Sequence, residues 1–472
     1  MNTINLIASQ AINTPAIARF FINFWLTTLF FIALPTYAAL PITQWTHASG
    51  AQIFLVHSPA IPMVDVQIDF DAGSRRDPAD KAGLASSTAL MLSKGVKALV
   101  SQPASQPAQF PALSDNQLSE AWADLGASFS AHASDDRMSF HLRSLTYPDL
   151  LPKATLLAAR QMGQSTLPTP IWLRERARLS AAIKEANTRP ATLATRAFEQ
   201  AVYGTHPYGF ETTEASLNRI SPRDMQAVLN TQLLPCRAKV SVVGALTKAQ
   251  ADDLVSTLLK WLPTAANSRT TACPNLPAVD EVKPLTQSFD KRINFNAAQA
   301  QVFIGQPGYK RDDPDFFALL VGNHILGGGA FTSRLTDQVR EKRGLTYSVY
   351  SYFAPGSHAG AFTIGLQTRP DQAAQAVQVV KDVLKDFVAN GPTEAELQAA
   401  KDNLIGGFAL RIDSNEKLLG NVANIAWNNL PLNYLDVWTQ QIDKITTTQI
   451  KAAMQRKLQP EKMVTVVLGG SN

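Results

Sequence analysis

At 472 residues the chain is too long for one hydrophobic core, so about two to four domains are expected. Hydrophobic residues make up 45% of the chain and charged residues 17%, which is typical of a globular protein and excludes a disordered one. The formal net charge of +5 is spread along the chain without a run of Lys or Arg. No nucleic-acid-binding motif is present, so we expect no nucleic-acid partner.

The N-terminus has the pattern of an export signal. Arg19 is the only charged residue before the apolar run of residues 20–34, and small residues follow where a signal peptidase would cut, after Ala38. The run is shorter than the roughly 20 residues that a membrane span needs. We therefore predict a signal peptide over residues 1–38 and a location in the periplasm or cell envelope, with no stable membrane span after cleavage. A retained membrane anchor is the alternative.

Several strands and helices are predicted for the first half. Residues 53–57 and 63–71 predict a β-hairpin, and the strict alternation of VDVQIDFDA in its second strand predicts that this strand is half-buried. The helices predicted after the hairpin cover residues 83–95, 115–125, 149–162 and 171–187, a run to Tyr203, and segments that begin at Ser221 and at Thr247. The further strands cover residues 128–133, 138–145 and 239–243.

Residues 263–283 are rich in Pro, Ala, Ser and Thr without periodicity and predict an interdomain linker. Cys236 and Cys273, the only cysteines, could form a disulfide in an oxidising compartment, but the sequence leaves their pairing open. After the linker, the strands predicted for the second half cover residues 301–305, 361–367 and 464–468. The helices cover residues 315–326 and 446–458 and the runs that end at Phe387 and Asn428.

The two halves repeat one plan. SLTYPDL (144–150) and LQTRPDQ (366–372) each lead into a helix, and the halves end in the similar strands VSVVG (240–244) and VTVVLG (464–469). Strands that gather among helix pairs favour an α+β fold over a doubly wound sheet. We predict two similar domains over residues 39–262 and 284–472, each a mainly antiparallel sheet packed with helices.

Three stretches resemble the pitrilysin, insulinase and mitochondrial-processing-peptidase family of zinc peptidases. They are AGLASSTALMLSKGV (82–96), HPYGFETTEASLNRISPRDMQAVL (206–229) and LGGGAFTSRLTDQVREKRGLTYSVYS (326–351), the last being the most specific. The resemblance covers nearly all of the chain after the signal peptide. It implies a clamshell-forming, metallopeptidase-like fold.

The residues that hold zinc in this family are missing from the chain. Active members carry H-x-x-E-H, in which two His bind zinc and the Glu is the general base. Ser86, Ala89 and Leu90 stand at those three positions. Ala182 stands at the downstream Glu ligand, seven residues after Glu175, which matches another Glu of the family. A serine hydroxyl is a poor zinc ligand and the other three side chains have no donor atom, so we predict no metal and no catalytic residue in this chain.

No replacement site is evident in the sequence. None of the seven histidines are spaced i, i+4. His132 and His141 fall on adjacent predicted strands and could bind a metal across them, but we expect solvent-facing strand residues instead. No G-x-S-x-G motif, nucleotide-binding loop or Cys–His nucleophile pair is present.

Arg340 and Tyr347 match a substrate-contacting pair of the family in type and spacing. Alone they would be read as a surface Arg and a strand Tyr. The resemblance implies that two-domain chains pair to enclose a chamber, in which a second-domain Arg and Tyr reach substrate at the partner's zinc. Arg can hold a carbonyl or carboxylate, and a Tyr hydroxyl can donate to a developing oxyanion.

The resemblance also implies a strand edge that binds peptide at Gly126–Ala133, where Ser130 and Ala131 replace the usual Asn-Ala. We predict a catalytically empty subunit of an exported heteromeric peptidase, which forms half the chamber and contacts peptide substrate. Its partner would be a homologous subunit that holds Zn²⁺. The alternative is a non-enzymatic peptide-binding or assembly protein. An enzyme with a different site has no motif to support it.

Overall fold

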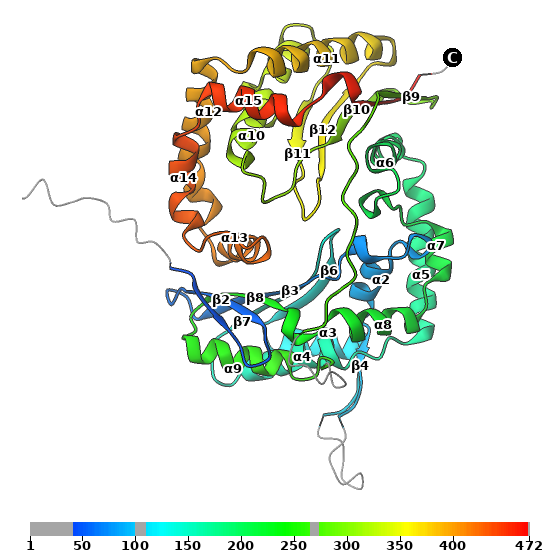
Figure 1. Ribbon diagram of the computed structural model, residues 1–472. Coiled ribbons are helices and arrows are strands. Elements are labelled where there is room, and N and C mark those ends of the chain that lie inside the picture. Colours follow the sequence, from blue (N-terminus) through cyan, green and yellow to red (C-terminus); the bar gives the residue numbers. More distant parts are fainter. Residues whose placement is uncertain (1–40, 100–109, 265–272, 471–472) are drawn as a thin grey trace, which may run out of the picture. The chain divides into compact units, whose positions relative to one another are not determined.

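The computed structural model describes residues 41–99, 110–264 and 273–470 (Figure 1). The predicted signal peptide and part of the predicted linker lie outside these residues. Pro41–Asn472 form one compact unit. Within the described residues, no helix combines the length and the apolar character needed to cross a membrane.

The first half is built on a six-stranded sheet with the order β1-β2-β8-β3-β7-β6. Only β2 and β8 are parallel. The strands are β1 (Thr43–Thr46), β2 (Gln52–His57), β3 (Met63–Phe70), β6 (Ser128–Ala133), β7 (Met138–Leu145) and β8 (Lys239–Gly244). The predicted hairpin of residues 53–57 and 63–71 is wrong, because β8 returns from far along the chain and lies between β2 and β3.

The described first half also contains eight α-helices and a small two-stranded sheet of β4 (Gly95–Val96) and β5 (Leu113–Ser114). A capping box begins α9 at Thr247, as predicted, and another begins α8 at Ser221, where the sequence predicted an N-cap. The helices are α2 (Leu84–Met91), α3 (Asp115–Asp124), α4 (Leu151–Gly163), α5 (Thr169–Ala186), α6 (Pro190–Tyr203), α7 (Glu214–Arg219), α8 (Pro222–Gln232) and α9 (Lys248–Leu259).

The second half repeats the plan with a five-stranded sheet of order β11-β12-β10-β13-β9, in which only β13 and β9 are parallel. Two similar α+β domains are therefore confirmed. The strands are β9 (Phe289–Ile293), β10 (Ala300–Pro307), β11 (Val349–Phe353), β12 (Ala361–Thr368) and β13 (Val464–Leu468). The helices are α10 (Phe316–Asn323), α11 (Ala373–Asn390), α12 (Glu394–Gly406), α13 (Asn415–Trp427), α14 (Tyr434–Asp443) and α15 (Thr447–Lys457).

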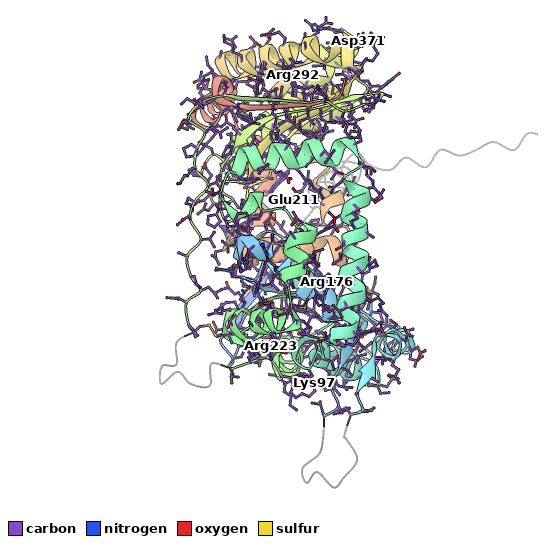
Figure 2. The ribbon with its side chains drawn as sticks, turned by 90° about the vertical axis from the view of Figure 1, so that its right-hand side faces the viewer. Lys97, Arg176, Glu211, Arg223, Arg292 and Asp371 are labelled. Atoms are coloured by element: carbon purple, nitrogen blue, oxygen red, sulfur yellow. A yellow bond between two sulfur atoms is a disulfide. The ribbon has the colours of Figure 1, made fainter. Side chains whose placement is uncertain are left out.

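Each half contributes one helix that packs on the sheet of the other half. Helix α13 packs on β8 and β3 of the first sheet, and α6 packs on β10 and β13 of the second (Figure 1). Figure 2 shows α5 running along the side of the first half, with α6 continuing from its end across to the second. Each sheet is therefore covered on one face by helices of its own half and on the other by a helix of the opposite half.

This exchange corrects the prediction for β3. The strand is buried along almost its whole length instead of on one face, because α13 covers its polar side. Arg143 Nε lies 2.6 Å from Asp65 Oδ1 and Arg137 Nη1 lies 3.2 Å from Asp69 Oδ2. Burial raises the pKa of Asp69, against the opposing charge of Arg137. The alternation of polar and apolar residues is real, but the polar residues are buried with charged partners.

Cys236 and Cys273, whose pairing the sequence left open, form a disulfide. The bond joins the segment before β8 to the start of the described part of the linker. Residues 274–286 continue from it without helix or strand. The disulfide therefore fastens one end of the linker to the first half.

Candidate functional site

Helix α2 carries three of the positions that would hold the zinc site. Ser86 is exposed, Ala89 is buried in the core and Leu90 is half-buried. The helix packs against β6, the edge strand of the first sheet. The structure thus brings these positions beside the predicted peptide-binding edge. Of their side chains, only Ser86 has a possible ligand atom, and a serine hydroxyl is a poor zinc ligand.

The start of α2 is held by a buried carboxylate. Asp77 accepts hydrogen bonds from the backbone N–H groups of Gly83 and Ala85 at 2.9 and 3.0 Å. Burial raises the pKa of Asp77 to about 7, although these N–H groups favour its charged form. Gly83 has a φ of +97°, which favours glycine, and a Cβ there would lie 2.6 Å from the Thr212 methyl group. The backbone conformation at the start of α2 is therefore well defined, although the side chains at the zinc positions lack good metal-ligand atoms.

Helix α5 carries the fourth position. Ala182 is exposed, and Glu175, two turns earlier, is buried. Glu175 accepts hydrogen bonds from Arg178 at 2.9 Å and Arg174 at 3.2 Å, and Lys94 Nζ lies 3.8 Å away. Burial opposes its ionisation, but these cations hold its pKa below the ordinary value. Glu175 thus serves as an ion-pair centre that links α5 to the end of α2.

The strand histidines stack on each other. The rings of His132 and His141 lie 4.9 Å apart at 12°. His132 is exposed as predicted, but His141 is half-buried, so the prediction of a solvent-facing residue is wrong there. Burial, with the neighbouring His132 and Arg137, lowers the pKa of His141 to about 4. In the described part of the chain, no group of three or more His, Cys, Asp or Glu side chains could hold a metal ion.

Strand β6 has a free edge, as the resemblance implied for Gly126–Ala133. It pairs only with β7, where Ser130 lies opposite His141 and Ala131 opposite Phe140. Strand β11, at one end of the second sheet, differs because one of its backbone oxygens is already hydrogen-bonded. The Asn323 amide donates to the backbone oxygen of Ser351 at 3.1 Å. Of these two strands, β6 is therefore the one better suited to pair with an extended peptide.

Arg340 is the second-to-last residue of a π-helical turn, Thr336–Glu341, in the second half. Its guanidinium lies 5.0 Å from the centre of the Phe331 ring, and its Nε lies 3.4 Å from Glu341 Oε1. The Arg340 side chain is 36% exposed and Phe331 is 73% exposed. The cation–π contact orients Arg340 while leaving its donors accessible to a ligand.

Tyr347 lies in the segment between Gly344 and β11 and is 85% exposed. The residues before it are anchored, since Leu345 is buried and Thr346 Oγ1 donates to Gln367 O at 2.6 Å. No hydrogen bond joins Tyr347 to Arg340 or to any other described residue. The structure therefore presents both predicted residues at the surface with unused hydrogen-bonding capacity.

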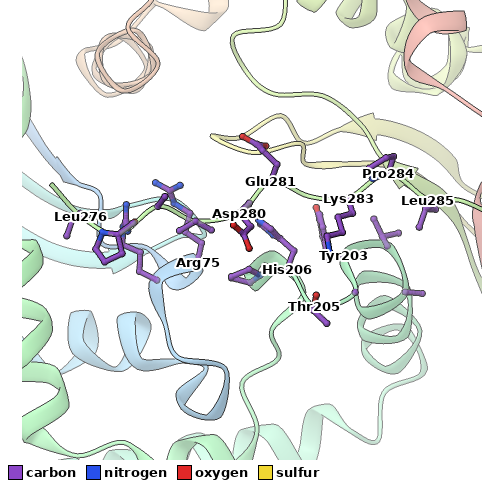
Figure 3. A pocket seen from close by; sticks show the side chains of 18 of the residues that line it. Arg75, Tyr203, Thr205, His206, Leu276, Asp280, Glu281, Lys283, Pro284 and Leu285 are labelled. Carbon is purple, nitrogen blue, oxygen red and sulfur yellow. Dashed lines mark hydrogen bonds between the residues drawn. The ribbon is translucent and has the colours of Figure 1, made fainter.

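Sequence reasoning missed two features. The first is Phe331, which follows Ala330, a non-glycine residue at a φ of +49°. In the sequence, the only signal for Phe331 was an aromatic residue after the glycine run. A cavity of about 1010 Å³ lies between the linker and the end of α6, lined in part by Arg75, Tyr203 and His206 (Figure 3). No local pattern marked this cavity, because its walls come from four separate parts of the chain.

Comparison with known proteins finds relatives over most of the chain. The family described as "Peptidase M16 inactive domain" matches residues 219–404. The crystal structure of a peptidase M16 inactive domain from Pseudomonas fluorescens is 32% identical, with a TM-score of 0.82. The match covers 91% of this chain and 98% of that one.

Curated relatives carry names of two kinds. "Uncharacterized zinc protease YmxG" of Bacillus subtilis is 24% identical, over 81% of this chain and 88% of the relative. "Non-peptidase homolog YmxG" of Helicobacter pylori is 26% identical, over 91% of this chain and 94% of the relative. Relatives that align with most of this chain are thus named as proteases in some cases and as a non-peptidase in another.

Proposed function

The chain belongs to the peptidase M16 family, as its sequence resemblance indicated, and on that premise we propose that it is the non-catalytic subunit of an exported heteromeric zinc peptidase. The match to an inactive M16 domain and the name of the Helicobacter relative support a non-catalytic member. The observation that carries the proposal is the contrast between α2 and the second half. Ser86, Ala89 and Leu90 do not fit zinc, whereas Tyr347 is exposed and Arg340 is partly exposed.

The proposed roles follow from the hydrogen-bonding capacity of each group. Arg340 would hold a carbonyl or carboxylate of the peptide, and the Tyr347 hydroxyl would donate to an oxygen as negative charge develops on it. The free edge of β6 would pair with the peptide backbone. Zinc and the hydrolytic step belong to a homologous partner, and no step is assigned to a metal in this chain.

The first test is metal analysis and peptide cleavage with the purified chain alone and with its co-purified partner. We expect no stoichiometric zinc and no cleavage from the isolated chain, and zinc-dependent cleavage from the pair. Stoichiometric zinc together with EDTA-sensitive cleavage by the isolated chain would overturn the proposal.

The second test uses Arg340→Ala and Tyr347→Phe in the reconstituted pair. Loss of one donor to a developing charge costs about 3 kcal/mol, so turnover should fall about 100-fold. Both side chains are at least partly exposed, so the free energy of unfolding should change by less than about 0.5 kcal/mol. Arg343→Ala, an exposed residue that binds Gln338, is the matched control and should leave turnover unchanged.

The alternative function is a non-enzymatic peptide-binding or assembly protein, which the name of the Helicobacter relative favours. In that case Arg340→Ala would change no reaction rate, and the proteins that co-purify with the chain would have no peptidase activity. Activity assays of the co-purified fraction distinguish the two functions directly.

A further inference from the structure

Three separate segments meet beside the cavity between the linker and α6. The loop between β11 and β12 brings Ser357 and His358 from the second half. The first half supplies Arg75, Asp136, His206 and Tyr208, and the linker supplies Asp280 and Glu281. Figure 3 shows Arg75, His206 and Asp280 close to one another at this junction, with Glu281 next to them on the linker and its side chain directed away from His206.

The β11–β12 loop is hydrogen-bonded to the first half through its backbone. The N–H of Ser357 donates to Asp136 Oδ2 at 2.8 Å, and the N–H of His358 donates to Tyr208 Oη at 3.2 Å. Tyr208 in turn donates to Asp136 Oδ1 at 2.6 Å. Gly356 allows this approach, since a Cβ there would lie 2.7 Å from Tyr208 Oη and 2.9 Å from Asp136 Oδ2.

The contacts of His358 determine its protonation. Arg75 Nη1 lies 2.9 Å from His358 Nε2, and a guanidinium can only donate, so this ring nitrogen must accept. The neutral ring therefore carries its proton on Nδ1, which lies 3.3 Å from Glu281 Oε2. A second proton would place an N–H group directly against the N–H donors of Arg75.

His206 is held in the same way. Its Nδ1 accepts the backbone N–H of Tyr208 at 3.1 Å, so its proton lies on Nε2 and is donated to Asp280 O at 3.0 Å. A second proton on Nδ1 would oppose the Tyr208 N–H. The rings of His206 and His358 lie 5.1 Å apart, so charging both would also place two cations side by side next to Arg75.

We propose that these eight residues form an acid-sensitive clasp, which fastens the β11–β12 loop and the linker to the first half and opens when His206 takes a second proton. That proton would lie on His206 Nδ1, to which the Tyr208 N–H already donates. Of the nearby negative charges, Asp136 accepts from Tyr208 and Ser357, and Asp71 pairs with Arg75 at 2.7 Å. Glu281 faces His358 Nδ1 and is shared with Lys310, which lies 3.1 Å away. Tyr203, the remaining titratable neighbour of His206, accepts the Ala361 N–H.

The direction of the pH effect follows from His206. Burial, with the neighbouring His358 and Arg75, lowers its folded-state pKa below 6.5. A folded pKa below the unfolded one means that the folded state binds fewer protons in the interval between them. The stabilisation is fully present above about pH 6.5 and is lost as the pH falls toward the folded value.

Opening of the clasp is a local change. The linker is also fastened by the Cys236–Cys273 disulfide and by Arg76, which donates to Pro277 O at 2.9 Å. Helices α6 and α13 still join the halves. Release at Asp280 and Glu281 therefore frees the far end of the linker and one wall of the cavity without separating the two sheets.

The test is hydrogen exchange of the full chain at pH 7.5 and 5.0, with rates corrected for the intrinsic effect of pH. Peptides that cover residues 354–361 and 279–286 report on the clasp. We expect at least a tenfold loss of protection at Ser357 and His358 at pH 5.0. In the double variant His206→Asn, His358→Gln, whose amide oxygens keep both acceptors without titrating, the loss should be less than twofold.

Two further variants complete the experiment. Gly356→Ala should remove the protection already at pH 7.5, because the added Cβ blocks the approach to Tyr208. His57→Gln, a histidine outside the clasp that binds Leu246 O, should keep the wild-type response. Equal loss in wild type and double variant, no loss in wild type, or unchanged protection in Gly356→Ala would each overturn the proposal.

Discussion

At the three α2 positions that align with the family's zinc motif, this chain has Ser86, Ala89 and Leu90. Ala89 lies in the core of the first half and Leu90 is half-buried, so apolar packing has taken the place of metal-binding groups on α2. Glu175 remains, but its carboxylate is engaged by cations. Arg340 and Tyr347 are at least partly exposed and contribute little to packing, which makes their substitution a clean test of function.

His141 predicts a pH-dependent stability at the residue scale. Its folded-state pKa of about 4 is below the ordinary value of 6.5, so its stabilisation is present above pH 6.5 and is lost between pH 6.5 and 4. In His141→Gln, the fall in unfolding free energy from pH 7 to pH 4 should be smaller by about 1–2 kcal/mol, allowing for partial solvent screening. Urea unfolding at both pH values measures this, and an unchanged difference would contradict it.

At the scale of elements, α13 is the helix that joins the halves most directly. It lies on the polar face of the first sheet, and Lys239 of β8 donates to the carbonyl oxygens of Ala426 and Trp427 at its C-terminus, at 2.8 and 3.0 Å. A cation at a helix C-terminus also interacts favourably with the helix dipole. Burial lowers the pKa of Lys239, but these acceptors satisfy its donors.

Lys239→Met should therefore loosen α13. The variant leaves the helix-end carbonyl groups without their donor, and the free energy of unfolding should fall by about 1–3 kcal/mol. Hydrogen exchange within Asn415–Trp427 should increase with it. Lys248→Met, whose ammonium lies 5.1 Å from the Trp45 ring at the surface, is the matched control and should change stability by less than about 0.5 kcal/mol. Equal effects of the two variants would contradict this role.

At the scale of the molecule, the exchanged helices make the two halves one folding unit. Ile42, Phe54, Val56 and Val243 of the first half share a hydrophobic cluster with the core of the second half. Phe198 of α6, in the first half, packs against the second sheet, where Val464 and Val466 lie. Neither sheet can therefore keep its second face covered if the halves separate.

This arrangement predicts cooperative unfolding. The chain from residue 41 onward should show a single calorimetric transition, and residues 41–264 or 284–472 produced alone should fail to give a cooperative melt, because each lacks the helix that covers its sheet. Differential scanning calorimetry of the full chain and of each half measures this. Two resolved transitions, or a stable isolated half, would contradict it.

The sequence alone determined the features that depend on neighbouring residues. The α+β class, the repeated plan, the N-cap at Ser221 and the capping box at Thr247 could be predicted, because periodicity and capping are local properties. The side chains of Ser86, Ala89 and Leu90 could also be read from the sequence, and the prediction that they bind no zinc depends only on side-chain type. Family membership followed from the stretches 82–96, 206–229 and 326–351.

Only the tertiary structure decided what distant segments do to one another. It placed β8 between β2 and β3, buried Asp65 and Asp69 under α13, and paired Cys236 with Cys273. It also brought His206 to His358 across the linker. Such contacts join residues tens to hundreds of positions apart, and their energies depend on burial and on opposing charges. No stretch of neighbouring residues contains that information.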